Sequence, residues 1–80
     1  MVTVYSKNNC PFCDRAKALL ESRGVPYTEV NIENDPESRQ MLLDKGLRSV
    51  PQIFNEFELI PGGFNGLNSK SVEFFQLLKG

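Results

Sequence analysis

Residues 6–20 read SKNNCPFCDRAKALL and contain both cysteines of this 80-residue chain, Cys10 and Cys13. Pro11 suits the first turn of a helix, because the N–H group that proline lacks would have no partner there. Apolar residues then follow at helical spacing, namely Phe12, Ala16, Leu19 and Leu20. The pattern predicts a helix over residues 11–23 with the cysteine pair at its beginning.

The predicted helix gives the two thiols different surroundings. Cys10 stands at the helix tip, where unpaired backbone N–H groups and the positive end of the helix dipole favour a thiolate. Cys13 shares a face with Ala16 and Leu20, so we expect it to be buried. The Cys10 thiolate can attack a disulfide and form a mixed disulfide, from which Cys13 then releases the reduced product. The spacing therefore favours dithiol–disulfide exchange.

Other roles for the cysteine pair stay open at this point. A disulfide that closes so short a loop constrains the unfolded chain little, so a structural staple explains the spacing poorly. Two inert buried cysteines are an alternative. A zinc site within one chain is disfavoured, because tetrahedral zinc takes four ligands and the sequence has no histidine and no third cysteine. A metal or cluster shared between two chains is a further alternative.

Length and composition indicate one small domain over residues 1–80. The chain is 40% hydrophobic and 24% charged, and its net charge of −1 gives no bulk attraction to nucleic acid or to an acidic membrane. No apolar run approaches the length of a membrane span, and the N-terminus lacks the basic start of a signal peptide. We therefore expect a cytoplasmic protein, in a compartment that keeps thiols reduced, and take it to be a monomer.

Strands alternate with helices along the rest of the chain. The runs that favour strands are residues 2–5, 27–32, 52–54 and 58–60, and the last two are joined as a hairpin. Together with the helices the order is β-α-β-α-β-β-α. This order predicts an α/β fold in which a four-stranded mixed sheet carries helices on its faces.

Two further helices are predicted after the first. The second begins at Pro36, which follows a capping acid, and closes at Lys45-Gly46. Its buried side is expected to be Met41, Leu42 and Leu43. The last helix begins near Asn65, or is capped by Asn68 or Ser69. Its buried stripe is expected to be Val72, Phe74, Phe75, Leu77 and Leu78.

Three motifs in this order and spacing resemble the glutaredoxins: CPFC at 10–13, SVP at 49–51 and the glycine pair at 62–63. The runs AKALLESRGVPYTEVNI and SVPQIF are also similar to that family, so the resemblance covers nearly the whole chain. It implies a thioredoxin-like fold in its minimal form and a single glutaredoxin domain. It also implies a thiol–disulfide oxidoreductase in which Cys10 is the nucleophile and Cys13 resolves the mixed disulfide.

The resemblance further implies a binding site for a cysteinyl substrate. Pro51 is expected to be cis and to lie against the cysteines, and Val50 to offer its backbone to the substrate in a strand-like pairing. Lys7 matches a lysine that meets a carboxylate of glutathione, although it is equally well a solvated loop lysine. Phe12 takes the place of the usual tyrosine. The expected substrate- or glutathione-binding residues are Lys7, Phe12, Arg48, Val50, Pro51, Gly63, Phe64 and Asn65.

The sequence departs from the family pattern after the glycine pair. The family has acidic residues there that bind the γ-glutamyl amino group, whereas this chain has Phe64-Asn65-Gly66, and Asn65 supplies no charge. The run is similar to short bacteriophage-type glutaredoxins and to the redoxins that serve ribonucleotide reductase, which often take electrons from thioredoxin reductase. Pro61 and one extra residue before Gly63 predict a distorted hairpin.

Two functional hypotheses follow. In the first, the protein reduces protein or glutathione mixed disulfides and has no bound cofactor or metal. Glutathione is its expected reductant, and thioredoxin reductase is the other electron source. Its partner is then a disulfide-containing client protein, with ribonucleotide reductase as a client by analogy. In the second, two chains hold an iron–sulfur cluster through Cys10. Pro11 argues against the second, because by family resemblance such scaffolds often vary that position.

Overall fold

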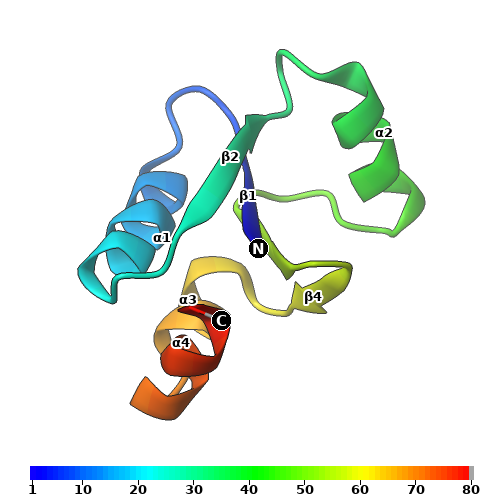
Figure 1. The fold of residues 1–80 in the computed structure, drawn as a ribbon. Helices are drawn as coiled ribbons and strands as arrows, with labels where there is room; N and C mark the ends of the chain where they lie inside the picture. The colour runs from blue at the N-terminus through cyan, green and yellow to red at the C-terminus, as the bar shows by residue number, and fades with distance from the viewer. Residues whose placement is uncertain (80) are drawn as a thin grey trace.

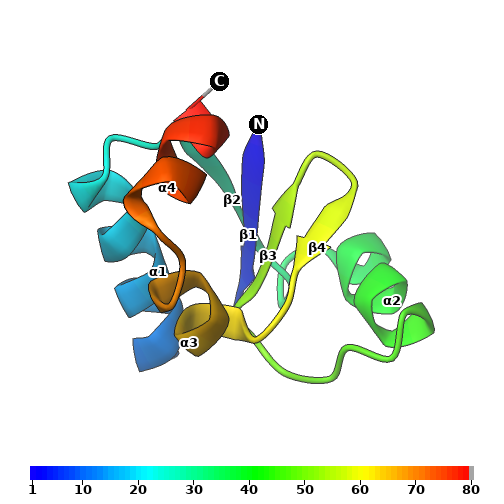
Figure 2. The same cartoon turned by 90° about the horizontal axis from the view of Figure 1, so that it is seen from below.

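The computed structural model describes residues 1–79, in which a four-stranded sheet lies between two layers of helices (Figure 1). The elements in chain order are β1 (Val2–Ser6), α1 (Pro11–Ser22), β2 (Tyr27–Asn31), α2 (Pro36–Asp44), β3 (Gln52–Asn55), β4 (Glu58–Ile60), α3 (Gly63–Asn68) and α4 (Val72–Lys79). Seen from below, α1, α3 and α4 cover one face of the sheet and α2 covers the other (Figure 2). The predicted mixed α/β architecture is confirmed.

The strand order in the sheet is β2-β1-β3-β4. β1 is parallel to β2 and antiparallel to β3, because α1 crosses over between the first pair whereas β3 returns from α2 in the opposite direction. The β3–β4 hairpin keeps a regular register that pairs Ile53 with Ile60 and Asn55 with Glu58. The distortion expected from the extra residue near Pro61 is therefore wrong, since the chain accommodates that residue after β4.

The core lies between the sheet and the layer of α1, α3 and α4. Strand β1 alternates as a half-buried strand should, so Val2, Val4 and Ser6 point inward. Val2 and Val4 belong to one apolar cluster with side chains from the helices and from β3 and β4, namely Ala16, Leu20, Ile53, Ile60, Leu67, Phe75 and Leu78. Each fully buried large side chain contributes about 1.5–3 kcal/mol. This layer therefore fixes α1, and with it the cysteine pair, on the sheet.

The C-terminal region holds two helices where the sequence predicted one. The hydroxyl of Ser69 donates to the carbonyl of Gly66 at 2.7 Å, where α3 ends. The hydroxyl of Ser71 accepts from the N–H of Phe74 at 3.2 Å and caps the start of α4. The predicted cap at Asn68 or Ser69 is therefore wrong, and a short helix is added before the last one.

Three residues expected in the core are exposed: Leu43, Val72 and Leu77. Val72 is the first residue of α4, so the helix end leaves it outside the packed layer. Leu77 is 78% exposed, because α4 buries only Phe75 and Leu78 completely. α2 buries only Leu42 completely, since no second helix covers its face of the sheet. Among residues 1–79, no helix is both long and apolar enough to span a bilayer.

Candidate active site

Cys10 occupies the cap position of α1. Its backbone is extended, with φ −120° and ψ 95°, and its carbonyl accepts the first helical hydrogen bond from Asp14 at 3.1 Å. Its Sγ accepts a hydrogen bond from the N–H of Cys13 at 3.2 Å. Pro11 is the first helical residue, as the sequence predicted. A cysteine sulfur thus takes the place that a serine or aspartate oxygen holds at ordinary helix starts.

The two sulfurs are joined, so the structure is that of the oxidised protein. A disulfide links Cys10 and Cys13, whose Cα atoms lie 5.2 Å apart. Cys13 is 1% exposed and Cys10 is 8% exposed. Both cysteines are therefore buried in the oxidised protein: the burial of Cys13 is as predicted, whereas Cys10, expected to be accessible at the helix tip, is only slightly more exposed than Cys13. Cys10 is covered in part by the segment before β3, since its Sγ lies 4.0 Å from the carbonyl oxygen of Val50.

That segment contains a cis peptide bond between Val50 and Pro51. Its position is held from both sides. The side-chain amide of Gln52 donates to the carbonyl of Ser49 at 2.8 Å. On the other side, a Cβ added to Gly63 would lie 3.2 Å from the carbonyl oxygen of Pro51, and the φ of Gly63 is +58°. Glycine at this position therefore lets α3 begin directly against the segment.

An aromatic pair flanks the disulfide on the α3 side. Phe12 of α1 is 48% exposed, and its ring centroid lies 6.2 Å from that of Phe64 in α3. The Arg15 guanidinium stacks over Phe12 at 5.0 Å from the ring centroid. A cavity of about 180 Å³ opens here, lined by Phe12, Ser49, Val50, Pro51, Gly62, Gly63, Phe64 and Asn65. Its lining contains no acidic side chain.

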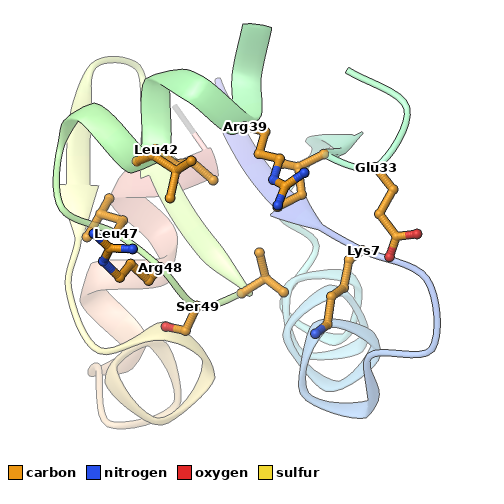
Figure 3. Close-up of a pocket in the computed structure, with 10 residues that line it drawn as sticks. Lys7, Glu33, Arg39, Leu42, Leu47, Arg48 and Ser49 are labelled. Carbon is orange, nitrogen blue, oxygen red and sulfur yellow. The ribbon is translucent and has the colours of Figure 1, made fainter. Parts of the chain in front are cut away.

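A larger cavity, of about 590 Å³, lies on the other side of Val50 (Figure 3). Its lining is Lys7, Ile32, Glu33, Arg39, Leu42, Leu43, Leu47, Arg48, Ser49 and Val50. Ser49 and Val50 are shared with the small cavity. The eight binding residues expected from the sequence all line one cavity or the other, with Val50 in both. Residues from four separate regions of the chain are thus brought together on the two sides of Val50, whose carbonyl oxygen lies 4.0 Å from the Cys10 Sγ.

Sequence reasoning missed two charged residues of the larger cavity, Arg39 and Glu33. Arg39 is exposed on α2, one turn before Leu42 and Leu43, and that spacing could have placed its side chain beside theirs. Glu33 could not have been found, because its position depends on two loops meeting. Its carboxylate accepts from the backbone N–H of Asn8 at 3.2 Å and from the Asn8 side chain at 3.0 Å.

A second polar cluster ties α1 to strands β1 and β2. The buried hydroxyl of Ser6 donates to the Glu29 carboxylate at 2.7 Å, and the Lys17 ammonium donates to the same oxygen at 2.8 Å. The hydrogen bond from Lys17, followed by that from Ser6, lowers the pKa of the Glu29 carboxyl. The hydrogen bond to Glu29 raises the pKa of Lys17. Because Lys17 lies one turn after Cys13, this cluster fixes the helix that carries the disulfide.

The arrangement suits disulfide exchange once the disulfide is reduced. The Cys13 N–H and the positive end of α1 both point at the Cys10 sulfur, and a hydrogen bond to a charged acceptor is stronger than one to a neutral acceptor. Cys13 lies beneath it, one turn into the helix and shielded from water. The outer sulfur is therefore placed to attack and the inner sulfur to resolve.

Comparison with known proteins agrees with this geometry. A family model described as Glutaredoxin matches residues 2–60. Glutaredoxin 3 of Escherichia coli (strain K12) is 42% identical over 62 residues, which make up 76% of this chain and 75% of that protein. The glutaredoxin-like protein NrdH of Lactococcus lactis subsp. cremoris (strain MG1363) is 42% identical over 53 residues, which make up 66% of this chain and 74% of that protein.

Solved structures give the same result over almost the whole chain. The NrdH-redoxin of Escherichia coli superimposes with a TM-score of 0.75 at 25% identity, covering 96% of this chain and 92% of that one. A glutaredoxin of Brucella melitensis superimposes with a TM-score of 0.77 at 36% identity, covering 98% and 87%. The predicted thioredoxin-like fold is confirmed. The chain therefore belongs to the glutaredoxin family and is a thiol–disulfide oxidoreductase with Cys10 and Cys13 as its cysteine pair.

Proposed function

We propose that the reduced protein transfers two electrons to the disulfides of client proteins and to glutathione mixed disulfides. The Cys10 thiolate attacks one client sulfur, and the other sulfur leaves as a thiolate and takes up a proton. Cys13, once deprotonated, attacks Cys10, releases the second client thiol and leaves the protein oxidised. The observation that supports the proposal is the cap position of Cys10, whose sulfur accepts a hydrogen bond from the N–H of Cys13 at 3.2 Å.

Single-cysteine variants test the roles of the two sulfurs. Cys13→Ser should accumulate a stable mixed disulfide with a client peptide, because nothing resolves it. Cys10→Ser should form no such adduct at neutral pH, because the remaining sulfur is buried and lies away from the helix tip. Mass spectrometry of acid-quenched reactions reads both outcomes. An adduct on Cys10→Ser that forms as fast as the one on Cys13→Ser would reverse the assignment.

Thioredoxin reductase is the electron source that we propose in preference to glutathione. The glutathione amino group needs an acidic partner, and the lining of the small cavity supplies only Asn65 at the corresponding place. The NrdH-redoxin of Escherichia coli, which resembles this chain, is described as having a thioredoxin-like activity profile. Glutathione, which the family resemblance also implies, is the alternative electron source.

A coupled assay separates the two electron sources. NADPH oxidation is measured with thioredoxin reductase and, in parallel, with glutathione and glutathione reductase. The thioredoxin reductase route should be faster for the native chain. Asn65→Asp should raise the glutathione-linked rate by about 2–5-fold, as expected for one added exposed charge pair. A native chain that is faster with glutathione would overturn this choice of reductant but leave the exchange chemistry intact.

The client and the compartment complete the proposal. By analogy with similar redoxins we propose ribonucleotide reductase as a client and the cytoplasm as the compartment. The client is tested by whether the reduced protein supports turnover of that enzyme as the sole electron donor, and the compartment by fractionation of cells that express the protein. If ribonucleotide reductase is activated by a small dithiol but stays inactive with the reduced protein, it is not a client.

A further inference from the structure

The larger cavity beside Val50 is lined by more cationic than anionic side chains. Lys7 comes from the loop after β1, Arg39 from α2 and Arg48 from the loop before β3, and all three are exposed around one hollow (Figure 3). One carboxylate faces the same hollow, that of Glu33, and it already accepts two hydrogen bonds from Asn8. The cavity therefore offers positive charge that exceeds the negative charge around it.

The cavity also has an apolar wall. Leu42 is buried at its base, and Ile32 and Leu47 are half-buried beside it. A volume of about 590 Å³ is comparable to a site for several side chains and exceeds what one carboxylate fills. Apolar surface beneath a rim of cations suits a stretch of polypeptide that carries acidic side chains, because the chain covers the wall while its carboxylates meet the rim.

The position of Val50 decides which part of a client enters the cavity. Val50 precedes β3, whose pairing with β1 begins at Gln52, so its backbone stands outside the sheet ladder. A client strand that pairs antiparallel with Val50 places its cysteine near Cys10, whose Sγ lies 4.0 Å from the Val50 carbonyl oxygen. Residues after the client cysteine then run toward Arg48, and residues before it run toward Pro51 and the small cavity.

We propose that this cavity selects client polypeptides with acidic side chains directly after the reacting cysteine, bound by Lys7, Arg39 and Arg48. The inference rests on the proposed function and deepens it by naming a substrate class. The chemical step is unchanged: the client disulfide is reduced to two thiols, and the Cys10–Cys13 dithiol is oxidised to the disulfide. Both electrons come from the reduced protein, so a single turnover needs no other reductant.

The test uses reduced full-length protein and three short synthetic peptides. Each peptide has one cysteine in a mixed disulfide with 2-mercaptoethanol. The first has two glutamates directly after the cysteine, the second has two glutamines there, and the third has the two glutamates directly before the cysteine. Single-turnover rates are measured by acid quench and mass spectrometry, and each is divided by the rate of the same peptide with dithiothreitol. This ratio removes any effect of the glutamates on the intrinsic reactivity of the disulfide.

The expected result is that the first peptide is reduced about fivefold faster than the second and the third in low salt. The preference should shrink between about 20 mM and about 500 mM salt, because these cations are exposed. The double variant Arg39→Gln/Arg48→Gln should bring the ratio of the first peptide to the second close to one. Lys45→Gln is the matched control: it removes a positive charge at the end of α2, outside the cavity, and should keep the native ratio.

Equal rates for the three peptides with the native protein would overturn the inference while leaving the exchange chemistry standing. So would a preference for glutamates before the cysteine, because that orientation directs them to the small cavity. A native protein that reduces none of the peptides would instead refute the proposed function itself. The salt dependence is measured on the native protein, so the inference stays testable even if the double variant does not fold.

Discussion

Replacing Gly66 with alanine is the substitution that this structure constrains most tightly. A Cβ on Gly66 would lie 1.9 Å from the carbonyl oxygen of Pro61, whereas real Cβ atoms essentially never come within 3.0 Å of another heavy atom. The obstacle is backbone, so α3 or the residues after β4 must move. Such overpacking costs about 3 kcal/mol at the upper end of the usual range, and alanine in a helix returns about 1 kcal/mol over glycine. The net loss of about 2 kcal/mol lowers the Tm of a domain this small by about 8–16 °C.

Thermal unfolding of the oxidised protein, followed by circular dichroism, measures this loss. Gly46→Ala is the matched control, because its Cβ would meet nothing within 4 Å and only its φ of +76° opposes alanine. That strain costs about 1 kcal/mol, so the control should unfold between the native protein and Gly66→Ala. α3 also carries Phe64 and Asn65, so Gly66→Ala should lose disulfide reductase activity at temperatures where it is still folded. A Gly66→Ala protein at least as stable as the native chain would refute the reasoning.

Two further predictions concern pH and the cysteine pair. Because its hydrogen bond from Lys17 lowers the pKa of the Glu29 carboxyl, the stabilisation by this contact is complete above the ordinary value of 4.5 and is lost as the pH falls through the lowered value. Glu29→Gln should therefore be less stable than the native chain at pH 7, by up to about 1 kcal/mol for a pair exposed to this degree. Urea titrations should show this difference shrink as the pH falls below 4.5, and a difference that does not change with pH would contradict the assignment. Anaerobic purification should give a colourless monomer, because Cys10 serves exchange, whereas a coloured dimer with cluster absorbance would support the scaffold alternative.

The first half of the fold could be predicted closely because its signals are local. Pro11 marks the start of α1 in the sequence and in the structure. Asp35 and Pro36 do the same for α2, where the Asp35 carboxylate caps the helix by accepting from the Ser38 hydroxyl at 2.8 Å and from its N–H at 3.5 Å. Such caps depend on residues within one turn of each other, so the sequence alone contains the whole interaction.

The C-terminal region could not be predicted in the same way because its determinants are tertiary. Gly66 reads as a weak point inside one long helix, yet the structure needs it where α3 passes the Pro61 carbonyl. Ser69 and Ser71 are both acceptable caps, and the structure uses Ser71 at the start of α4. Nothing in the local sequence separates these choices. What separates them is the packing of Leu67 and Phe75 into one core.

The residues of the candidate site likewise divide into those with a local sequence signal and those that depend on tertiary structure. The spacing of the two cysteines predicts their role directly. The binding residues around them were predicted from the family resemblance and not from the geometry of the predicted elements. Arg39 was predicted neither from the cysteine spacing nor from the family resemblance. It lies on α2, far along the chain from the cysteines, and it reaches the site only because α2 covers the opposite face of the sheet from α1. Its spacing from Leu42 and Leu43 indicates which side of α2 it shares, but nothing in the local sequence indicates that a cavity lies beneath that side.

Val50 lines both cavities, so a client strand that pairs with Val50 contacts both of them, and together they determine which clients bind. One end of the site is apolar and lacks an acid around Phe12 and Phe64, and the other is cationic. Glutathione has an ammonium group at one end and a carboxylate at the other, so only its carboxylate end finds a complementary charge here. A peptide with an apolar residue before its cysteine and acidic residues after it matches both ends. We infer that the missing acid at Asn65 disfavours glutathione, whereas the cations around the larger cavity favour any client that has a carboxylate after its cysteine.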